Sequence, residues 1–224
     1  MCGRFSLFSS FEDIIQTFDV EKMINEDEYT KTYNIAPTHD IITIINDGRI
    51  NRMGKLRWGL IPKWASDPKI SAKMINARSE TIDEKPSFRE SFIRRRCIIP
   101  MDSFFEWKQD NAIKQPFRIK MKNEQLFAVA GIWDTWYSST GERINSCTML
   151  TTSPNELMSS LHHRMPVILP KKEYENWLNP LEQDTQVLRS LLVPYPTSGM
   201  DAYPVSTAVN SVRNNDQSLI QQIS

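Results

Sequence analysis

Glycine is scarce in this chain of 224 residues, long apolar runs are missing, and opposite charges cancel. There are 7 glycines, and no Gly-rich phosphate loop follows any strand-like run, which argues against a doubly wound nucleotide-binding sheet. The longest nearly unbroken apolar run, 126–133, is far too short to span a bilayer, and no apolar leader opens the chain. We therefore expect a cytoplasmic protein, nucleoid-associated if bacterial, with no membrane partner.

Cysteine is also sparse. Cys2, Cys97 and Cys147 cannot all pair, and their spacing matches no zinc module. We expect free thiols, no metal and no other cofactor. Cys97 and Cys147 lie in strand-like runs among apolar or small residues, which favours core positions for both. No repeat, low-complexity tract or linker divides the chain, so we expect a single domain.

The net charge of zero conceals an uneven distribution. Residues 1–47 hold 3 basic and 9 acidic residues, residues 48–122 hold 18 and 8, and the remainder holds 6 and 10. Clustered Lys and Arg are typical of a protein that contacts a polyanion, although a solvated basic surface gives the same count. The middle third is therefore where we look for a nucleic-acid contact.

Helix starts and strand-length runs together predict an α+β fold. Helices are expected after the capping box Ser9–Glu12, after Ser87–Glu90, and after Ser153, which Pro154 follows at the first helical position. The strand-length runs are 41–45, 55–60, 97–100, 104–108, 117–121, 126–133, 147–152 and 167–169. Polar turns at 109–111 and 122–124 favour hairpins, and hence an antiparallel or mixed sheet.

The chain begins Met1-Cys2-Gly3-Arg4. Cys is a small second residue that permits removal of Met1, and Cys2 would then carry an amine and a thiol on adjacent carbons. Its amine has an ordinary pKa of about 7.7 to 8.0, so a neutral fraction is present at cellular pH. Such a 1,2-aminothiol reacts with an aldehyde to give a Schiff base and then a thiazolidine. An N-terminal Cys also serves as nucleophile and base in some hydrolases, and Cys2 is otherwise an ordinary second residue.

Six short segments occur in order along the chain. They are Met1-Cys2-Gly3-Arg4-Phe5, Tyr33-Asn34-Ile35-Ala36-Pro37, Trp58-Gly59-Leu60-Ile61-Pro62, Ile75-Asn76-Ala77-Arg78-Ser79-Glu80-Thr81, Phe104-Phe105-Glu106-Trp107-Lys108 and Leu161-His162-His163-Arg164-Met165-Pro166, followed by Pro204-Val205-Ser206 and Asn210. The series resembles the SOS response-associated peptidase (SRAP) family, whose members shield abasic sites in DNA. Each segment alone is weak evidence, but the ordered series is specific and covers nearly the whole chain.

The resemblance implies one SRAP domain over residues 1–224, with 2–224 as the mature chain, and mixed and antiparallel sheets that form a barrel-like core with flanking helices. It implies that Met1 is removed by the protein itself and that Cys2 forms a thiazolidine crosslink with the ring-opened sugar aldehyde of an abasic site in single-stranded DNA. In this reading Cys2 is the nucleophile and Asn76 orients the terminus and the sugar. Glu106 is the acid/base group, and His162 assists ring opening.

Each of these roles suits the residue type and has an ordinary alternative. A partly desolvated carboxyl both takes and gives protons near neutral pH, and a histidine pKa near 6.5 suits the opening of a cyclic sugar. However, Glu106 alternates with Phe105 and Trp107 and so equally points to water. Asn76 equally caps a turn, and His162 equally ends a helix.

The resemblance also implies DNA contacts. Arg4 and Arg78 match positions that hold the backbone, while polar contacts, a wedge or stacking faces would come from Asn34, Pro37, Trp58, Trp64 and Trp107. Core packing is the alternative for Trp58 and Trp107. The run Arg94-Arg95-Arg96 predicts a solvated face or a helix-dipole complement.

Two positions depart from the family pattern. Ser103 stands where Gly is usual, and His163 replaces an acidic residue that often follows the key histidine; register with Arg164 and Pro166 favours His162 as the site residue. A Schiff base would also permit β-elimination, which makes strand cleavage a side reaction. Two other functions remain open: an N-terminal-cysteine peptidase or amidohydrolase, and a non-catalytic nucleic-acid-binding module. A monomer is the default expectation.

Overall fold

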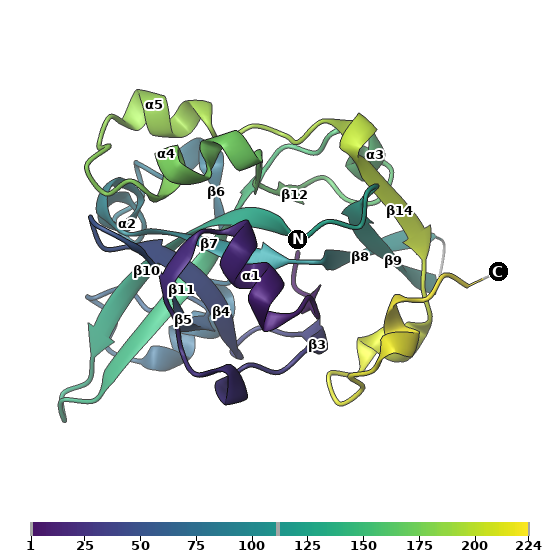
Figure 1. The fold of residues 1–224 in the computed structure, drawn as a ribbon, viewed down its shortest axis with the longest axis horizontal. Coiled ribbons are helices and arrows are strands. Elements are labelled where there is room, and N and C mark those ends of the chain that lie inside the picture. Colours follow the sequence, from purple (N-terminus) through teal and green to yellow (C-terminus); the bar gives the residue numbers. More distant parts are fainter. Residues whose placement is uncertain (1, 111–112, 224) are drawn as a thin grey trace.

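Two β-sheets and a set of short helices make up the part of the chain that the computed structural model describes, residues 2–110 and 113–223 (Figure 1). The strands are β1 (Phe5–Leu7), β2 (Val20–Lys22), β3 (Thr32–Ile35), β4 (Asp40–Asn46), β5 (Asn51–Trp58), β6 (Asn76–Arg78), β7 (Arg96–Met101), β8 (Ser103–Asp110), β9 (Ile113–Met121), β10 (Phe127–Tyr137), β11 (Arg143–Thr152), β12 (Met165–Pro166), β13 (Ile168–Leu169) and β14 (Met200–Pro204).

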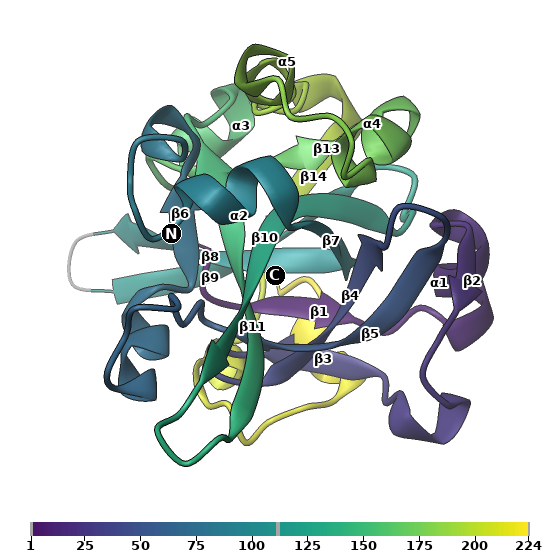
Figure 2. The same cartoon turned by 90° about the vertical axis from the view of Figure 1, so that its left-hand side faces the viewer.

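The helices are short and lie mostly at the periphery (Figures 1 and 2). The α-helices are α1 (Phe11–Thr17), α2 (Arg89–Arg94), α3 (Glu156–Ser159), α4 (Tyr174–Leu178) and α5 (Thr185–Ser190). The 3₁₀ helices are η1 (Glu26–Glu28), η2 (Pro68–Lys73), η3 (Ser79–Thr81), η4 (Lys171–Glu173), η5 (Thr197–Gly199), η6 (Thr207–Asn210) and η7 (Gln217–Ile220). None of the described helices is long and apolar enough to cross a membrane.

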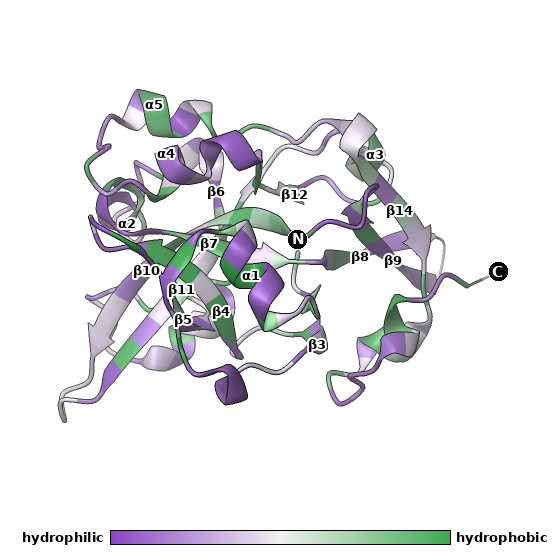
Figure 3. Cartoon of the chain, in the orientation of Figure 1, coloured by the Kyte–Doolittle hydropathy of each residue, from purple (hydrophilic) through white to green (hydrophobic). Residues whose placement is uncertain are grey.

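The larger sheet closes into a barrel. Its strand order is β12-β11-β10-β7-β4-β5-β2, and β11 also pairs in parallel with β5, where Cys147 lies opposite Trp58. This second pairing closes a ring of β5, β4, β7, β10 and β11, so the expected α+β fold with a barrel-like core is confirmed. Figure 3 shows hydrophobic residues along β4, β7 and β10. Cys97 and Cys147 are buried in this core as free thiols, as predicted.

The smaller sheet carries the N-terminal strand. Its order is β14-β9-β8-β1-β3, and every pair in it is antiparallel. β1 joins it to the barrel, because the Phe5 ring packs edge-on against Trp58 with centroids 5.2 Å apart. The C-terminal segment that includes η6 and η7, yellow in Figure 1, packs against this sheet through a separate apolar cluster of Phe105, Val205, Val209, Leu219 and Ile220.

One of the few glycines has a clear structural reason. Gly59 follows β5 with a φ of +131°, and its N–H donates to the Cys147 carbonyl at 2.8 Å. A Cβ at this position would collide with the backbone oxygen of Ser71. The chain leaves the barrel here in a conformation that L side chains rarely adopt, so the site needs glycine.

The helix starts differ from the predicted ones by one or two residues. Ser10, not Ser9, caps α1: its hydroxyl accepts from the Asp13 N–H, and Asp13 completes the capping box. The helix predicted at Ser87–Glu90 is present as α2, but Phe88 precedes it without a side-chain cap, so Ser87 does not cap it. Asn155 caps α3 by accepting from Met158 N–H, which leaves the predicted Ser153 cap outside the helix. In each case the cap comes from a residue closer to the first turn of the helix than the predicted one, or no side chain supplies it.

The predicted strands are present, but their connections differ in part. β5 starts at Asn51 rather than residue 55 and ends at Trp58, before Gly59 turns the chain. β8 and β9 form an antiparallel hairpin, although Asn111 of the predicted turn lies outside the described residues. The turn at 122–124 makes no hairpin, because β9 and β10 belong to different sheets.

Arg96 contradicts the prediction of a solvated arginine run. Arg94 is exposed, but Arg96 is buried and stacks over the Trp177 ring at 5.7 Å. Burial lowers its pKa to about 10, which leaves it charged at pH 7. Its guanidinium donates to the carbonyls of Phe92, Ile93, Trp177, Asn179 and Glu182. The cation therefore ties α2 and α4 to the barrel.

Candidate active site

Strand register places Glu106 beside the N-terminus. β1 and β8 run antiparallel with Phe5 opposite Phe104, and Phe105 N–H donates to the Arg4 carbonyl at 2.9 Å. The same register, continued, sets Gly3 opposite Glu106. The Glu106 residue is 3% exposed, so the alternative that it points to water is wrong. Burial raises its pKa to about 7, and the carboxyl is therefore poised to give or take a proton at neutral pH.

Asn76 holds the backbone of Cys2. β6 begins at Asn76, which lies opposite Met149 of β11, and its Nδ2 donates to the Cys2 carbonyl at 2.9 Å. The Oδ1 of Asn76 is buried and has no hydrogen-bond partner among the described residues. An amide in this position fixes the direction of the N-terminal segment and keeps a buried acceptor beside it.

The thiol of Cys2 is enclosed rather than activated. Cys2 is 1% exposed, and its Sγ donates weakly to the Arg4 carbonyl at 3.8 Å. Burial raises the pKa of the thiol, and the neighbouring Glu106 carboxylate raises it further. Both effects disfavour a thiolate, so the sulfur is a protonated thiol at neutral pH.

His162 lies in the loop between α3 and β12. Its Nδ1 accepts the Arg164 N–H at 3.0 Å, and its ring stacks on His163 with centroids 4.2 Å apart. Burial lowers the pKa of His162, and the neighbouring His163 lowers it further. The ring is thus mainly neutral at pH 7. His163 is exposed, and it is His162 that lines a groove together with Glu106.

That groove has a volume of about 540 Å³ and is lined by Glu106, Trp107, Gln109, Lys114, His162 and Asn210. An adjoining hollow of about 560 Å³ shares Trp107, Gln109 and His162 and continues past Lys108 to Ser159 and Ser160 at the end of α3. The two form an open trough between the β8–β9 hairpin and the loop after α3. Its shape suits an extended chain with basic and aromatic contacts more than a small enclosed ligand.

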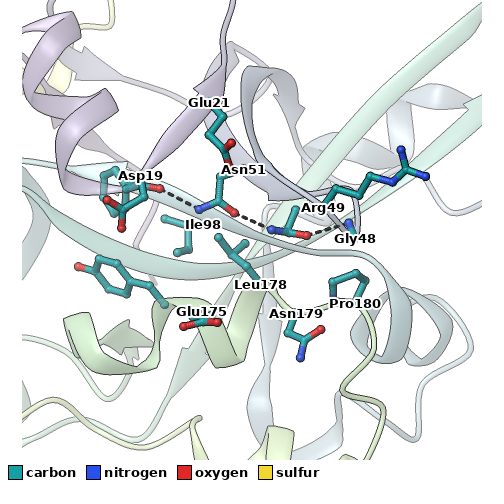
Figure 4. Close-up of a pocket in the computed structure, with 13 residues that line it drawn as sticks. Asp19, Glu21, Gly48, Arg49, Asn51, Ile98, Glu175, Leu178, Asn179 and Pro180 are labelled. Atoms are coloured by element: carbon teal, nitrogen blue, oxygen red, sulfur yellow. Dashed lines mark hydrogen bonds between the residues drawn. The ribbon is translucent and has the colours of Figure 1, made fainter.

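A separate hollow lies between the β4–β5 turn and α4, and its lining differs from that of the trough (Figure 4). Its volume is about 380 Å³, and none of the described residues that line it is a Cys, Ser or His. Its amides bond within the chain: Asn51 Nδ2 donates to the Phe18 carbonyl at 2.9 Å, and Asn46 Nδ2 donates to Asn51 Oδ1 at 2.8 Å. These groups hold the turn, and we assign no reaction to them.

Two of the residues predicted to contact DNA are structural. Trp58 is 0% exposed, with its Nε1 donating to the Ile75 carbonyl at 2.9 Å, so it offers no stacking face and the core alternative is right. Asn34 is 1% exposed and faces the chain itself. It accepts from Arg4 Nη1 at 2.7 Å, and its Nδ2 donates to the carbonyls of Val209, Ser211 and Asn214. A direct contact from Asn34 is therefore excluded by its burial.

The other predicted contacts are accessible to different degrees. Trp107 is half-buried, lines the groove and donates from Nε1 to Asn210 Oδ1 at 2.7 Å. Arg4 also bonds the Val209 carbonyl at 2.7 Å, which commits part of its guanidinium to the fold. Trp64 is 62% exposed, Arg78 is exposed and Pro37 is half-buried, but none of these three lines the groove.

Sequence reasoning assigned no role to Gln109, Lys114 or Asn210, which line the groove. Gln109 and Lys114 lie opposite each other in the β8–β9 hairpin, and Asn210 ends η6 about a hundred residues further along the chain. The hairpin register was the available signal for the first two. Asn210 belongs to the series of family-like motifs, but only the packing of the C-terminal segment brings it to Trp107.

Comparison with known proteins gives several full-length matches. The chain is 54% identical over 222 residues to the abasic site processing protein YoqW of Bacillus subtilis (strain 168), covering 99% of each. It is 30% identical to the abasic site processing protein HMCES of Xenopus tropicalis, covering 85% of this chain and 66% of that protein.

Solved structures share the fold. A protein from Bacteroides thetaiotaomicron matches the whole of both chains with a TM-score of 0.90 at 32% identity. A protein from Bordetella bronchiseptica matches 92% of this chain and 100% of its own with a TM-score of 0.77 at 26% identity. The model of the SOS response associated peptidase (SRAP) family matches residues 1–212. The chain therefore belongs to the SOS response associated peptidase family.

Proposed function

We propose that this protein senses abasic sites in single-stranded DNA and shields them by a covalent bond to Cys2. The observation that carries the proposal is that Cys2, Asn76 and Glu106 lie together just before the start of β1, beside a groove that His162 lines. The names of the relatives, abasic site processing proteins, support the same class of substrate. A DNA substrate also fits the cytoplasmic location expected from the sequence.

The reaction begins with hydrolysis of the Met1–Cys2 peptide bond by one water molecule, which frees the Cys2 amine. Met1 itself lies outside the described residues. The amine nitrogen then attacks C1′ of the ring-opened sugar, and the aldehyde oxygen leaves as water, giving a C=N bond. Finally Sγ bonds to that carbon and the thiol proton moves to nitrogen. Relative to the freed amine and the aldehyde, the thiazolidine has lost one water and no electrons.

Glu106 supplies the proton transfers that this sequence needs. The carbinolamine must lose oxygen as water, which requires an acid, and the amine must lose a proton after attack, which requires a base. A carboxyl with a pKa of about 7 is present in both forms at neutral pH. Asn76 lowers the entropic cost of the attack by fixing the Cys2 carbonyl, and with it the direction of the adjacent amine.

The state of the thiol separates this reaction from the peptidase alternative. A cysteine peptidase attacks with a thiolate, and such sites lower the thiol pKa with nearby positive groups. Burial and the Glu106 carboxylate raise the pKa of Cys2 instead. The geometry therefore favours an amine that attacks first and a thiol that closes the ring afterwards. The same Schiff base would acidify the neighbouring sugar proton, so slow β-elimination with strand cleavage is a secondary activity of this proposal.

DNA binding would rest on backbone contacts and stacking, since an abasic site has no base to read. Trp107 lines both parts of the trough, Lys108 and Lys114 add positive charge, and Arg78 and Trp64 are exposed outside it. Base stacking on an aromatic side chain and phosphate contacts by Lys and Arg are the usual basis of single-strand binding. No sequence preference is expected.

The test uses processed protein and single-stranded DNA with one abasic site, separated on a denaturing gel after heating. We expect a slow band from the wild type, none from Cys2→Ala, and an unchanged band from Cys97→Ala, which removes a buried thiol far from the terminus in sequence. A persistent band from Cys2→Ala would overturn the proposal. Turnover of peptides that survives saturation with abasic DNA would favour the peptidase, and salt-sensitive complexes without a stable band would indicate a binding module.

A further inference from the structure

Arg164, in the same loop as His162, forms a bidentate ion pair with Glu80. Arg164 Nη1 lies 2.6 Å from Glu80 Oε1, and Nη2 lies 2.9 Å from Oε2. Nη2 also donates to the Thr151 carbonyl at 2.6 Å, on β11. Arg164 is therefore held by a carboxylate and a main-chain oxygen from two different elements, and such bidentate pairs fix geometry more strictly than single contacts.

These contacts fix the main chain at the point where it meets His162. The Arg164 N–H donates to His162 Nδ1 at 3.0 Å, two residues along the same loop. Nδ1 also lies 3.3 Å from the Arg164 carbonyl oxygen, to which a protonated Nδ1 would donate, but its contact with the N–H is shorter. Because an amide N–H is always a donor, the shorter contact favours Nδ1 as the unprotonated nitrogen, with the proton of the neutral ring on Nε2. With Nδ1 turned to the backbone, the ring presents Nε2–H on its other side, toward the groove that it lines.

Glu80 belongs to the same segment as Asn76. It lies in η3, which follows β6 directly, and β6 pairs with β11 so that Asn76 lies opposite Met149 and Arg78 opposite Thr151. The ion pair thus connects the segment that holds Cys2 with the loop that carries His162. The carboxylate therefore adds a side-chain link to the pairings of β11 with β6 and β12, which hold the two halves of the site together.

We propose that Glu80 is a positioning residue which, through Arg164, holds His162 in its Nε2–H form facing the groove. The inference rests on the proposed role of His162 in opening the sugar ring. When C1′–O4′ breaks, the bonding electron pair stays on O4′, and the hydroxyl proton on the C1′ oxygen passes through water to O4′ as the C1′ oxygen becomes the aldehyde oxygen. A neutral Nε2–H donates a hydrogen bond to the O4′ that develops negative charge, and O4′ ends as a hydroxyl. Histidine in its neutral form stabilises developing oxyanions in this way.

The variant that tests this is Glu80→Gln, which keeps the shape of the side chain and removes its charge. Asp83→Asn is the matched control, because Asp83 forms an ion pair with Arg189, at 2.9 and 3.1 Å, without a contact to the His162 loop. Arg189 also donates to the main-chain carbonyl of Glu80 at 3.1 Å, so this control perturbs the surroundings of Glu80 while it keeps the Glu80 carboxylate. Long-range ¹H–¹⁵N NMR of the ring nitrogens in the DNA-free protein reads the tautomer of His162 directly. We expect the Nε2–H form alone in the wild type and Asp83→Asn, and a mixture of both tautomers in Glu80→Gln.

Crosslinking kinetics provide the second readout. We expect Glu80→Gln to slow crosslinking at saturating abasic DNA by about three- to tenfold, the effect of one lost hydrogen bond, with affinity for intact single strands kept or raised because Arg164 is released. An unchanged His162 tautomer in Glu80→Gln would overturn the inference even if crosslinking is slower. The tautomer shift without any crosslinking in the wild type would instead count against the proposed function and leave the positioning role intact.

Discussion

Replacing Glu106 with Gln should make the protein more stable at alkaline pH while abolishing crosslinking. Burial raises the carboxyl pKa to about 7 in the folded chain, against an ordinary value of 4.5. The folded state therefore holds this proton more tightly than the unfolded chain. The stability that this contributes is complete below pH 4.5 and is lost as the pH rises through 7.

The size of the effect follows from the two pKa values. Between pH 5 and pH 8 the buried carboxylate should cost the wild type about 2–3 kcal/mol of unfolding free energy. Gln cannot ionise, so the Glu106→Gln variant does not lose this stability. The difference in unfolding free energy between variant and wild type should therefore change by the same amount between pH 5 and pH 8. This corresponds to a relative shift of about 1 M in the urea midpoint.

Urea unfolding followed by tryptophan fluorescence at both pH values measures this difference. Because the unfolding free energies of wild type and variant are compared at the same pH, the contributions of the other titrating groups cancel. Glu142→Gln is the control, because this carboxylate is exposed in the β10–β11 loop. A variant-minus-wild-type difference that is equal at pH 5 and pH 8 would refute the raised pKa, and with it the argument that Glu106 is both acid and base at neutral pH.

Other substitutions separate structural residues from those at the groove. Trp58→Ala should cost about 3–5 kcal/mol in urea unfolding, because it empties a fully buried site. Trp107→Ala should cost less stability than Trp58→Ala, because the Trp107 ring is only half-buried against the C-terminal apolar cluster, and it should weaken single-strand binding by about 1–3 kcal/mol in fluorescence anisotropy. Arg96→Met should cost about 3 kcal/mol of stability, since buried carbonyls lose their donor. The fraction of this variant that stays folded should bind DNA with the affinity of the wild type. Gly59→Ala should cost about 2–4 kcal/mol in the same unfolding assay, through strain and a collision with Ser71.

The sequence predicted the elements of the fold better than their partners. Alternation in β8 correctly marked a strand and set Phe105 and Glu106 on opposite faces, but it left open whether Glu106 points to water or lines a groove. Both are buried: the C-terminal segment packs against Phe105, and Glu106 lies next to Cys2. The parallel pairing of β11 with β5 that closes the barrel joins segments nearly ninety residues apart. No local pattern reports such a pairing.

The same limit applied to the candidate site. Asn76, Glu106 and His162 were named from an ordered series of motifs, and the structure brings them to one region around Cys2 and the groove. The predictions for Asn34 and Arg96 were wrong because the sequence around a polar residue does not show whether its side chain contacts a ligand, solvent or the chain's own carbonyls. Their partners lie on segments distant in sequence, at Val209 for Asn34 and at Asn179 for Arg96.

The central claim is that the Cys2 amine and thiol together capture the abasic sugar. Mass spectrometry of the N-terminal peptide from the purified conjugate tests it most directly, after digestion of both protein and DNA. We predict a peptide that begins at Cys2, lacks Met1, and carries the sugar remnant with the loss of one water, with no free thiol on Cys2. Attachment through a lysine, or a conjugate that retains Met1, would contradict the account.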